Sequence, residues 1–237
     1  MEIIWEGLKE AAVKIFTGNQ EIYTILAVTI KVSGIAILFS AFLGIPLGVL
    51  IGTNKFPGKR LVIALINTGM SVPPVAVGLF LALIFWRSGP LGFLEIMYTP
   101  TAMIISQIII AAPIIIGITI SSVQQVGSNL IIQAKSLGTN KTQLLWLLIK
   151  ETKLGILVAL SAGFGRAISE VGAVLIVGAN IEDKTRVLTT ATLQMVRVGK
   201  FDSAIALVAI LLFLSFGINI VISIIQYKER FVWMTRL

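Results

Sequence analysis

The sequence predicts an all-α integral membrane protein with five transmembrane helices. Of its 237 residues, 57% are hydrophobic and only 13% are charged, whereas about 25% of the residues in an ordinary soluble domain are charged. The apolar residues gather into five stretches that reach the length of about 20 residues needed to cross a bilayer as a helix. These stretches lack the alternation of apolar and polar residues that barrel strands require, so helices are the expected elements.

The residue types that the chain lacks exclude several kinds of chemistry. It contains no Cys and no His, which excludes disulfides, Cys/His metal sites, Cys nucleophiles and His general bases. It also has no G-x-x-x-x-G-K-[ST] loop for binding nucleotide phosphates. We therefore expect a protein that is not an enzyme and binds no cofactor or metal. Any ATP and Mg²⁺ that drive its function would be held by a separate ATPase subunit.

Residues 1–20 are interpreted as an N-terminal amphipathic helix. Four apolar residues recur there at helical spacing: Ile4, Leu8, Ala11 and Ile15. Charged residues fill the other side of that helix, a pattern typical of helices that lie in the membrane interface. Packing of the apolar side on the protein's own bundle is the alternative, and the sequence leaves both open.

The transmembrane domain is expected to occupy residues 21–228. Its five spans are predicted at residues 22–52, 61–86, 101–123, 154–177 and 203–226. A cytoplasmic loop, residues 124–153, follows the third span, and residues 229–237 form a C-terminal tail. The first span contains Lys31, whose long side chain is expected to snorkel to the interface, with a position facing a pore as the alternative.

The distribution of Lys and Arg predicts the orientation of these spans. The loops after the first and third spans and the C-terminal tail carry 10 cations and two acids, whereas the opposite side carries seven cations and eight acids. Because cytoplasmic loops are enriched in Lys and Arg, the N-terminus is placed outside the cell and the C-terminus in the cytoplasm. The formal net charge of +8 is then a signal of topology, and we expect no nucleic-acid partner.

The cytoplasmic loop of residues 124–153 is expected to form a helix–Gly–helix elbow. Apolar residues follow a helical spacing up to Gly138, which would end the first helix. Asn140 followed by Gln143 is typical of a capping box that opens a second helix. The apolar side chains of such an elbow need a partner. A groove in a cytoplasmic protein and the protein's own bundle remain equal alternatives.

Two charged residues lie near the middle of the fourth predicted span. Arg166 and Glu170 are four residues apart, so a continuous helix would place them on one face. A charge at the bilayer centre costs about 2.5–3.5 kcal/mol on insertion scales, so both residues must be paired or face a polar cavity. We expect them either to line or brace a translocation path, together with Ser169, or to form a structural pair. Arg before Glu is the weaker helical order, so a partner on another helix is a further alternative.

Small residues recur every fourth position along the same span. They are Ser161, Gly165, Ser169 and Ala173. Small residues at this spacing allow helix backbones to approach closely. We therefore expect this stripe, above all Ser161, Gly165 and Ala173, to pack helices within the bundle or across a dimer axis, with substrate binding as the alternative.

The second span contains Ser71, Pro73 and Pro74 near its centre. Proline removes a helical hydrogen bond and clashes with the preceding turn, and the carbonyl groups that it frees within a membrane need partners or a cavity. Broken helices near the midplane form substrate sites in many transporters, and a helix N-terminus there would present N–H groups to an anion. These three residues are assigned to the translocation path, with a simple kink as the alternative.

One segment of the cytoplasmic loop resembles the "EAA" signature of binding-protein-dependent ABC importer permeases. The segment comprises Gln133, Ala134, Lys135, Ser136, Leu137 and Gly138. Ala134 and Gly138 match the second Ala and the Gly of the signature, whereas Ile132 and Gln133 stand in place of its Glu and first Ala. Residues 148–151 occupy its Ile-x-Leu-Pro end and lack the Pro. The resemblance implies that residues 133–138 dock into an ATPase subunit and transmit its motion.

A second resemblance lies in the fourth span and the loop that follows it. Two runs carry it: residues 165–173 (GRAISEVGA) and 185–190 (TRVLTT). They resemble the oxyanion permeases, which transport molybdate, tungstate and sulfate. The form is most similar to the tungstate branch, because the molybdate branch more often has Phe where Val171 stands. The likeness covers residues 22–228.

These resemblances imply the permease subunit of a type I ABC importer in the cytoplasmic (inner) membrane. Its partners would be a second copy of the chain, a cytoplasmic ABC ATPase dimer and an extracytoplasmic oxyanion-binding protein. The expected cargo is tungstate, with molybdate or sulfate as alternatives. A stand-alone ion-coupled carrier or channel is the competing function, and a non-transporting scaffold is a third. The lack of an internal repeat and the cytoplasmic elbow disfavour a carrier.

Overall fold

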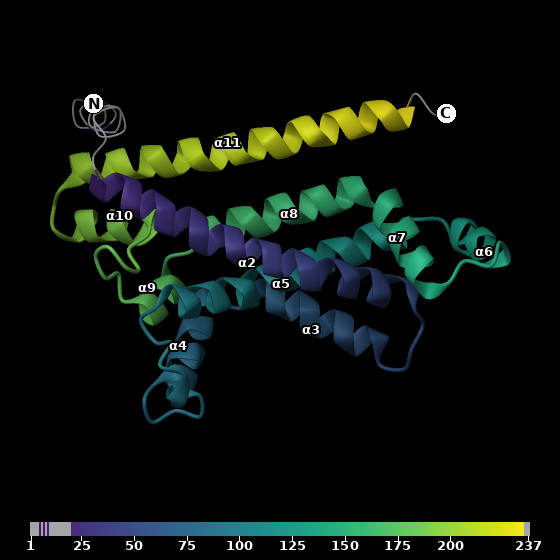
Figure 1. Ribbon diagram of the computed structural model, residues 1–237, viewed down its shortest axis with the longest axis horizontal. Helices are drawn as coiled ribbons and strands as arrows, with labels where there is room; N and C mark the ends of the chain where they lie inside the picture. Colours follow the sequence, from purple (N-terminus) through teal and green to yellow (C-terminus); the bar gives the residue numbers. More distant parts are fainter. Residues whose placement is uncertain (1–4, 6, 8, 10–19, 235–237) are drawn as a thin grey trace.

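The computed structural model describes Trp5, Gly7, Lys9 and residues 20–234, and within these residues every regular element is helical (Figure 1). The α-helices are α2 (Gln20–Thr53), α3 (Lys59–Ser71), α4 (Pro74–Phe85), α5 (Pro100–Gln124), α6 (Ser128–Ser136), α7 (Lys141–Glu151), α8 (Lys153–Ile168), α9 (Gly172–Gly178), α10 (Leu188–Arg197) and α11 (Phe201–Met234). A short 3₁₀ helix, η1 (Gly92–Leu94), lies between α4 and α5. The all-helical prediction is thus confirmed for the part of the chain that the structure describes.

Among the residues that the structure describes, three helices are long and apolar enough to cross a membrane without interruption: α2, α5 and α11. Two further spans arise if bent pairs are counted, because α3 meets α4 at an angle of 97° and α8 meets α9 at 55°. The predicted spans at residues 61–86 and 154–177 are therefore both broken. The break in the first was expected from its prolines, whereas the second was expected to be a continuous helix, and that expectation is wrong. The described part of the chain offers between three and five spans, at the positions that the apolar stretches indicated.

The break between α3 and α4 follows from two consecutive prolines. The helical region is sterically disfavoured for a residue before proline, and both Val72 (ψ 130°) and Pro73 (ψ 124°) are extended. Pro74 then opens α4 at its first helical position, where a missing N–H is tolerated because that group has no intrahelical acceptor. The interruption that the prolines predicted is confirmed.

The close crossing of α2 and α5 depends on glycines spaced four residues apart. A Cβ atom at Gly48 would lie 2.6 Å from the Cβ atom of Thr119, and one at Gly52 would lie 2.9 Å from a methyl group of Val123. Gly44 is similarly close to Ile115. Small residues thus allow two long spans to approach closely. These residues lie on α2, whereas the stripe predicted from the sequence lies on the fourth span.

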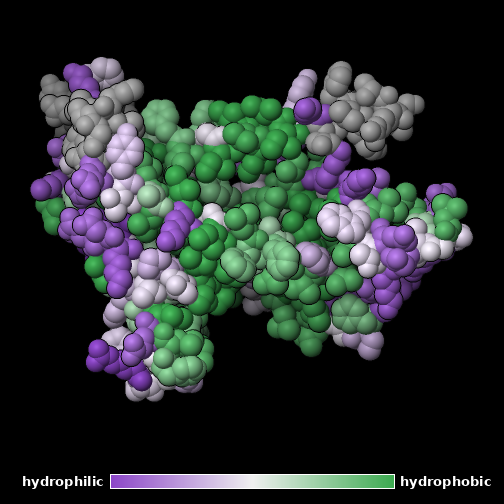
Figure 2. Space-filling view, in the orientation of Figure 1, coloured by the Kyte–Doolittle hydropathy of each residue, from purple (hydrophilic) through white to green (hydrophobic). Residues whose placement is uncertain are grey.

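The surface divides into an apolar middle and polar ends. Figure 2 shows hydrophobic side chains over the middle of the molecule and hydrophilic side chains gathered toward two ends, one over α10 and the other over α6 and α7. Large exposed apolar side chains follow α11, among them Leu212, Phe213, Phe216 and Ile224. An apolar belt of this kind is the surface expected of a protein embedded in lipid.

The two predicted terminal segments are described only in part. The predicted amphipathic helix of residues 1–20 lies outside the described residues except for four positions. One of these, Gly7, is buried, and a Cβ atom there would lie 2.6 Å from a methyl group of Ile205 on α11. The segment therefore contacts the bundle at this point. At the other end, α11 continues to Met234, so most of the predicted tail of residues 229–237 is helical.

Candidate functional site

The two broken spans meet through the half-helices that follow their breaks. A Cβ atom at Gly78 of α4 would lie 2.7 Å from the Cα atom of Ala173 on α9, and one at Gly172 would lie 2.6 Å from a methyl group of Val75. Ala173 is fully buried at this contact with α4. The breaks at residues 72–73 and 169–171 are thereby placed side by side.

Glu170 lies in the second break and organises the helix that follows. Its side chain is buried, and its Oε1 atom accepts a hydrogen bond from the backbone N–H of Ala173 at 3.0 Å. Its backbone carbonyl accepts a hydrogen bond from the hydroxyl of Thr189 at 2.9 Å. A carboxylate at a helix N-terminus satisfies free N–H groups and interacts favourably with the helix dipole. Glu170 therefore caps α9 and connects it to α10.

Arg166 and Glu170 do not share a continuous helical face, which corrects the expectation from their spacing. Helix α8 ends at Ile168, and Ser169 follows as its C-cap. Both residues are described, and no ion pair joins them. Arg166 is half-buried in the last turn of α8, where a cation is favoured by the negative end of the helix dipole. The two charges are stabilised separately, each by a helix end.

Gln107 was missed by sequence reasoning and supports the same region from α5. This buried side chain donates from Nε2 to the carbonyl of Ala167 at 3.1 Å. That carbonyl lies in the final turn of α8, where helical carbonyl groups lack their regular intrahelical donors, and it also accepts from the N–H of Glu170 at 3.2 Å. The sequence did carry a signal for this contact, because Gln107 is an isolated amide within an apolar span. A buried polar group is almost always hydrogen-bonded, so a partner on another element could have been expected.

The four small residues of the stripe predicted on the fourth span lie in different environments. The hydroxyl of Ser161 donates to Oδ1 of Asn219 on α11. A Cβ atom at Gly165 would meet nothing within 4 Å, and Ser169 is exposed, with its hydroxyl bonded back to the carbonyl of Gly165 at 2.8 Å. Ala173 belongs to α9 rather than α8. The four residues therefore do not form one packing surface, because the break rotates the last of them away.

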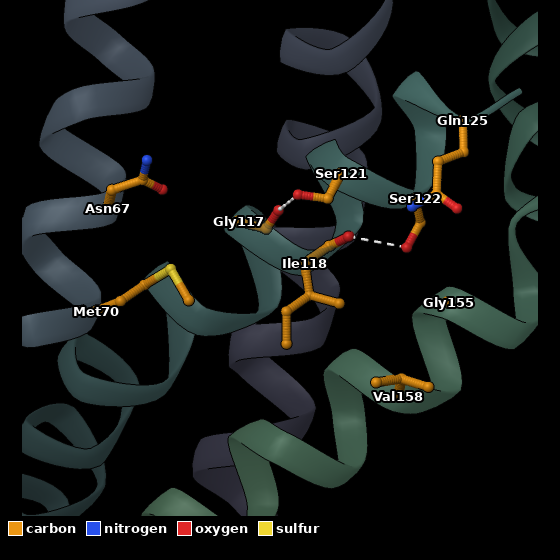
Figure 3. A pocket seen from close by; sticks show the side chains of 9 residues that line it. All are labelled: Asn67, Met70, Gly117, Ile118, Ser121, Ser122, Gln125, Gly155 and Val158. Carbon is orange, nitrogen blue, oxygen red and sulfur yellow. Dashed lines mark hydrogen bonds between the residues drawn. The ribbon is translucent and has the colours of Figure 1, made fainter.

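A cavity of about 400 Å³ lies among α3, α5 and α8 (Figure 3). It is lined by Asn67, Met70, Gly117, Ile118, Ser121, Ser122, Gln125, Gly155 and Val158. The lining includes two amides and two hydroxyl groups and no charged side chain. The hydroxyls of Ser121 and Ser122 donate to carbonyl groups one turn earlier on α5, at 3.2 and 2.8 Å. This surface can offer a polar molecule neutral dipoles, which sequence reasoning had not located.

The elbow between the third and fourth spans is confirmed. Gly138 follows α6 with φ +80°, a left-handed conformation that glycine adopts without strain at a helix C-terminus. The predicted capping box opens α7, because Asn140 Oδ1 accepts from the N–H of Gln143 and Gln143 Oε1 accepts from the N–H of Asn140, both at 2.8 Å. Local sequence therefore determines the shape of this turn.

Some apolar residues of the elbow pack on the bundle, and others are exposed at the surface. Leu148 of α7 is buried in a cluster with Val49 and Val123, so α7 packs on the bundle. On the α6 side, Ala134 is buried, whereas Leu137 is 85% exposed and Ile132 is 60% exposed. Four further residues of the predicted docking segment are exposed: Gln133, Lys135, Ser136 and Gly138. The α7 half of the elbow therefore packs on the bundle, whereas the α6 half leaves apolar side chains exposed.

At the end of the bundle opposite the elbow, the loop between α9 and α10 forms polar contacts with α2. The guanidinium of Arg186, which is only 8% exposed, lies 3.4 Å from the carboxylate of Glu21 and 3.5 Å from that of Glu182. The N–H of Leu188 donates to the hydroxyl of Thr29 at 3.0 Å. These contacts hold the first turn of α10 against the first turns of α2.

Comparison with known proteins agrees with this architecture. The family model for the binding-protein-dependent transport system inner membrane component matches residues 44–228. The tungstate uptake system permease protein TupB of Peptoclostridium acidaminophilum is 42% identical over 226 residues, which cover 95% of this chain and 99% of that protein. A protein of Haloferax volcanii named probable anion ABC transporter permease protein is 45% identical over 83% of this chain and 87% of its own length.

A solved structure shares the fold. A chain of the MetNI methionine ABC transporter, solved in inward-facing conformations, superposes with a TM-score of 0.70 at 18% identity and covers 91% of this chain and 97% of its own. At this identity the likeness concerns the fold alone. The broken spans, the elbow of α6 and α7, and the family match over residues 44–228 lead to one assignment. The chain belongs to the family of binding-protein-dependent transport system inner membrane components.

Proposed function

We propose that this chain is the permease subunit of an ABC importer for an oxyanion, with tungstate as its cargo. The single observation that carries the importer proposal is the exposed elbow of α6, Gly138 and α7 at one end of a bundle whose second and fourth spans are broken. The relative from Peptoclostridium acidaminophilum, which is named a tungstate uptake permease, supports the choice of cargo. Molybdate and sulfate are the competing oxyanions.

The proposed topology has five spans, with the N-terminus outside and the C-terminus in the cytoplasm. In this arrangement α2, α5 and α11 cross the membrane directly, and each bent pair, α3 with α4 and α8 with α9, supplies one more crossing. The Lys and Arg residues then gather on the side of the elbow and of the loop between α2 and α3, as the positive-inside rule requires. The loop between α9 and α10, which contains Arg186, then lies on the outer side of the membrane.

The proposed assembly contains two copies of this chain, two cytoplasmic ATPase subunits and an extracytoplasmic binding protein. Leu137 and Ile132 give α6 an apolar surface that would fit a groove of the ATPase. ATP and Mg²⁺ would be bound and hydrolysed by that partner. Closure of the ATPases would push on α6, and α7 would transmit the movement to the bundle through Leu148.

The proposed translocation path follows the two breaks and the polar cavity. Ser71, Pro73 and Pro74 end α3 and open α4, while Arg166 and Ser169 lie at the other break. Glu170 braces that break as the cap of α9. The cavity beside α3 is lined by neutral amides and hydroxyls, which would hold a dianion only weakly. Weak contacts suit passage, while selection of the anion would rest with the binding protein.

Transport by purified components tests this proposal against the alternative of a stand-alone ion-coupled carrier. Proteoliposomes that contain the permease, its ATPase subunits and the binding protein are expected to accumulate tungstate only when ATP is supplied on the ATPase side. Omission of the ATPase should abolish uptake. Tungstate flux through the permease alone under an imposed ion gradient would contradict the importer proposal. Uptake of molybdate or sulfate in place of tungstate would contradict only the choice of cargo.

A further inference from the structure

A cavity of about 430 Å³ lies at the turn between α2 and α3 and is lined by three cations. Its lining residues are Lys55, Phe56, Gly58, Lys59, Arg60 and Ile63. No acidic side chain is among these described residues, so the charge of the three cations is not balanced within the cavity. The turn is therefore a concentrated basic site with apolar side chains beside it.

The three cations have different roles. The ammonium group of Lys59 donates to the carbonyl of Gly52 at 2.9 Å and to that of Asn54 at 3.0 Å. These carbonyls end α2, whose last turn contains no basic residue, so Lys59 completes that helix end. Lys55 and Arg60 are exposed, and neither forms an ion pair or side-chain hydrogen bond with any described residue. These two cations remain available to a ligand.

The start of α3 adds to the positive potential of the cavity. Cations in the first turn of a helix are unfavourable because the N-terminus already carries a partial positive charge, yet α3 begins with Lys59 and Arg60 and has no acid in its first turn. Its N-cap, Gly58, supplies no side chain to accept hydrogen bonds. A bound anion would compensate the two cations and the helix end together.

The apolar surface next to the cations favours a lipid over a free anion. Phe56 and Ile63 belong to the lining, and Leu61 and Leu65 of α3 are 64% and 63% exposed. Free phosphate would neutralise the cations and leave this apolar surface bare. A phospholipid would place its phosphate at the cations and its acyl chains along α3, as basic pockets beside membrane spans do at the cytoplasmic face.

We propose that Lys55 and Arg60 bind the phosphate of an anionic phospholipid of the inner leaflet, with its acyl chains against Phe56, Ile63 and the exposed leucines of α3. The inference rests on the proposed topology, which places this turn at the cytoplasmic membrane surface. It does not depend on the identity of the transported anion. The lipid would anchor the junction of α2 and α3 at the membrane surface.

Native mass spectrometry of the purified importer complex tests the proposal. The complex is titrated with phosphatidylglycerol or with phosphatidylcholine of identical acyl chains. We expect wild-type complex to retain phosphatidylglycerol preferentially, and Arg60→Gln to weaken that preference by about fivefold, the contribution of one basic residue near an anionic surface. The double variant Lys55→Gln/Arg60→Gln should lose the preference, and Arg60→Lys should keep it.

Lys228→Gln is the matched control, because it removes one exposed cation from the C-terminal part of α11, away from the cavity. Its lipid preference should equal that of wild type. An equal loss in this control, or no preference in wild type, would overturn the proposal. Displacement of phosphatidylglycerol by equimolar inorganic phosphate would assign the site to a free anion instead.

The same spectra distinguish lipid binding from a contact with the ATPase. If the double variant sheds the ATPase subunits while its phosphatidylglycerol preference is unchanged, the turn binds the ATPase and the lipid proposal is wrong. These measurements need no transport activity. A complex that binds phosphatidylglycerol as expected but moves no tungstate would therefore contradict the proposed function and leave the lipid site intact.

Discussion

Oε1 of Glu170 accepts a hydrogen bond from the backbone N–H of Ala173 at 3.0 Å, across the break between α8 and α9. The bond fixes the first turn of α9, which packs against α4 through Gly78. One buried carboxylate thus stabilises the end of one broken span and its packing on the other.

Glu170→Ala is expected to lower the free energy of unfolding by about 1–2 kcal/mol, since it removes a helix cap and a favourable interaction with the helix dipole. Glu170→Gln retains a carbonyl oxygen and should lose less. Thermal unfolding of the detergent-purified chain measures both. Glu95→Gln, at an exposed acid, is the control. Full stability and transport in Glu170→Ala would show that the cap is dispensable.

The crossing of α2 and α5 gives a prediction with an internal control. Gly48→Ala would place a methyl group against Thr119, so we expect a loss of about 1–3 kcal/mol from overpacking. Gly34→Ala lies on the same helix, where a Cβ atom would meet nothing within 4 Å. It should be neutral or stabilising by up to about 1 kcal/mol, because alanine favours helix. Melting temperatures that rank the two variants in the opposite order would refute the described packing.

The bond between Thr29 and the start of α10 predicts a second matched pair. Thr29→Val preserves the shape of this buried side chain but leaves the N–H of Leu188 without its acceptor. We expect destabilisation by about 1–3 kcal/mol, the penalty for a buried unsatisfied donor. Thr24→Val removes a hydroxyl that bonds only to the carbonyl of Gln20 one turn earlier and should shift the melting temperature little. Equal shifts in both variants would contradict this assignment.

The elbow predicts a defect in assembly rather than in folding. Leu137 is 85% exposed, so Leu137→Ser should leave the melting temperature of the permease unchanged and reduce the amount of ATPase that copurifies with it. Phe93→Ser, at a residue of η1 that is 76% exposed, should affect neither quantity. Gly138→Asp, which forces a side chain into φ +80°, should abolish ATP-driven uptake. Normal ATPase recovery with Leu137→Ser would argue against docking through this residue.

Features determined by neighbouring residues were predictable from the sequence. Two consecutive prolines disfavour the helical conformation at Val72 and Pro73, and the exchange of hydrogen bonds between Asn140 and Gln143 needs only a spacing of three residues. The break beside Ser161, Gly165 and Ser169 had no such signal. It arises where Glu170 caps α9 and α9 packs on α4, and these contacts join residues distant in sequence.

The choice between two stripes of small residues illustrates the same limit. Gly44, Gly48 and Gly52 recur every fourth residue, as Ser161, Gly165 and Ser169 do. All three residues of the first set lie against a facing helix. In the second set Ser161 contacts α11, whereas Gly165 faces open space. Spacing indicates that a close approach is sterically allowed. Which face receives a partner depends on contacts between residues distant in sequence, and the local spacing does not specify these contacts.

The polar cavity beside α3 yields the last prediction, which concerns transport alone. Asn67 contributes a neutral amide to a lining without charged side chains, and Asn67→Asp would add a negative charge to that surface. Two like charges a few ångströms apart repel by about 1 kcal/mol even in bulk water and more near a protein surface, and the cargo is a dianion. We expect tungstate uptake in proteoliposomes to fall on the order of tenfold or more, while the ATPase subunits still copurify. Asn67→Ser, which keeps a neutral polar group, should transport normally. If Asn67→Asp transports as fast as Asn67→Ser, the cavity lies outside the route of the anion.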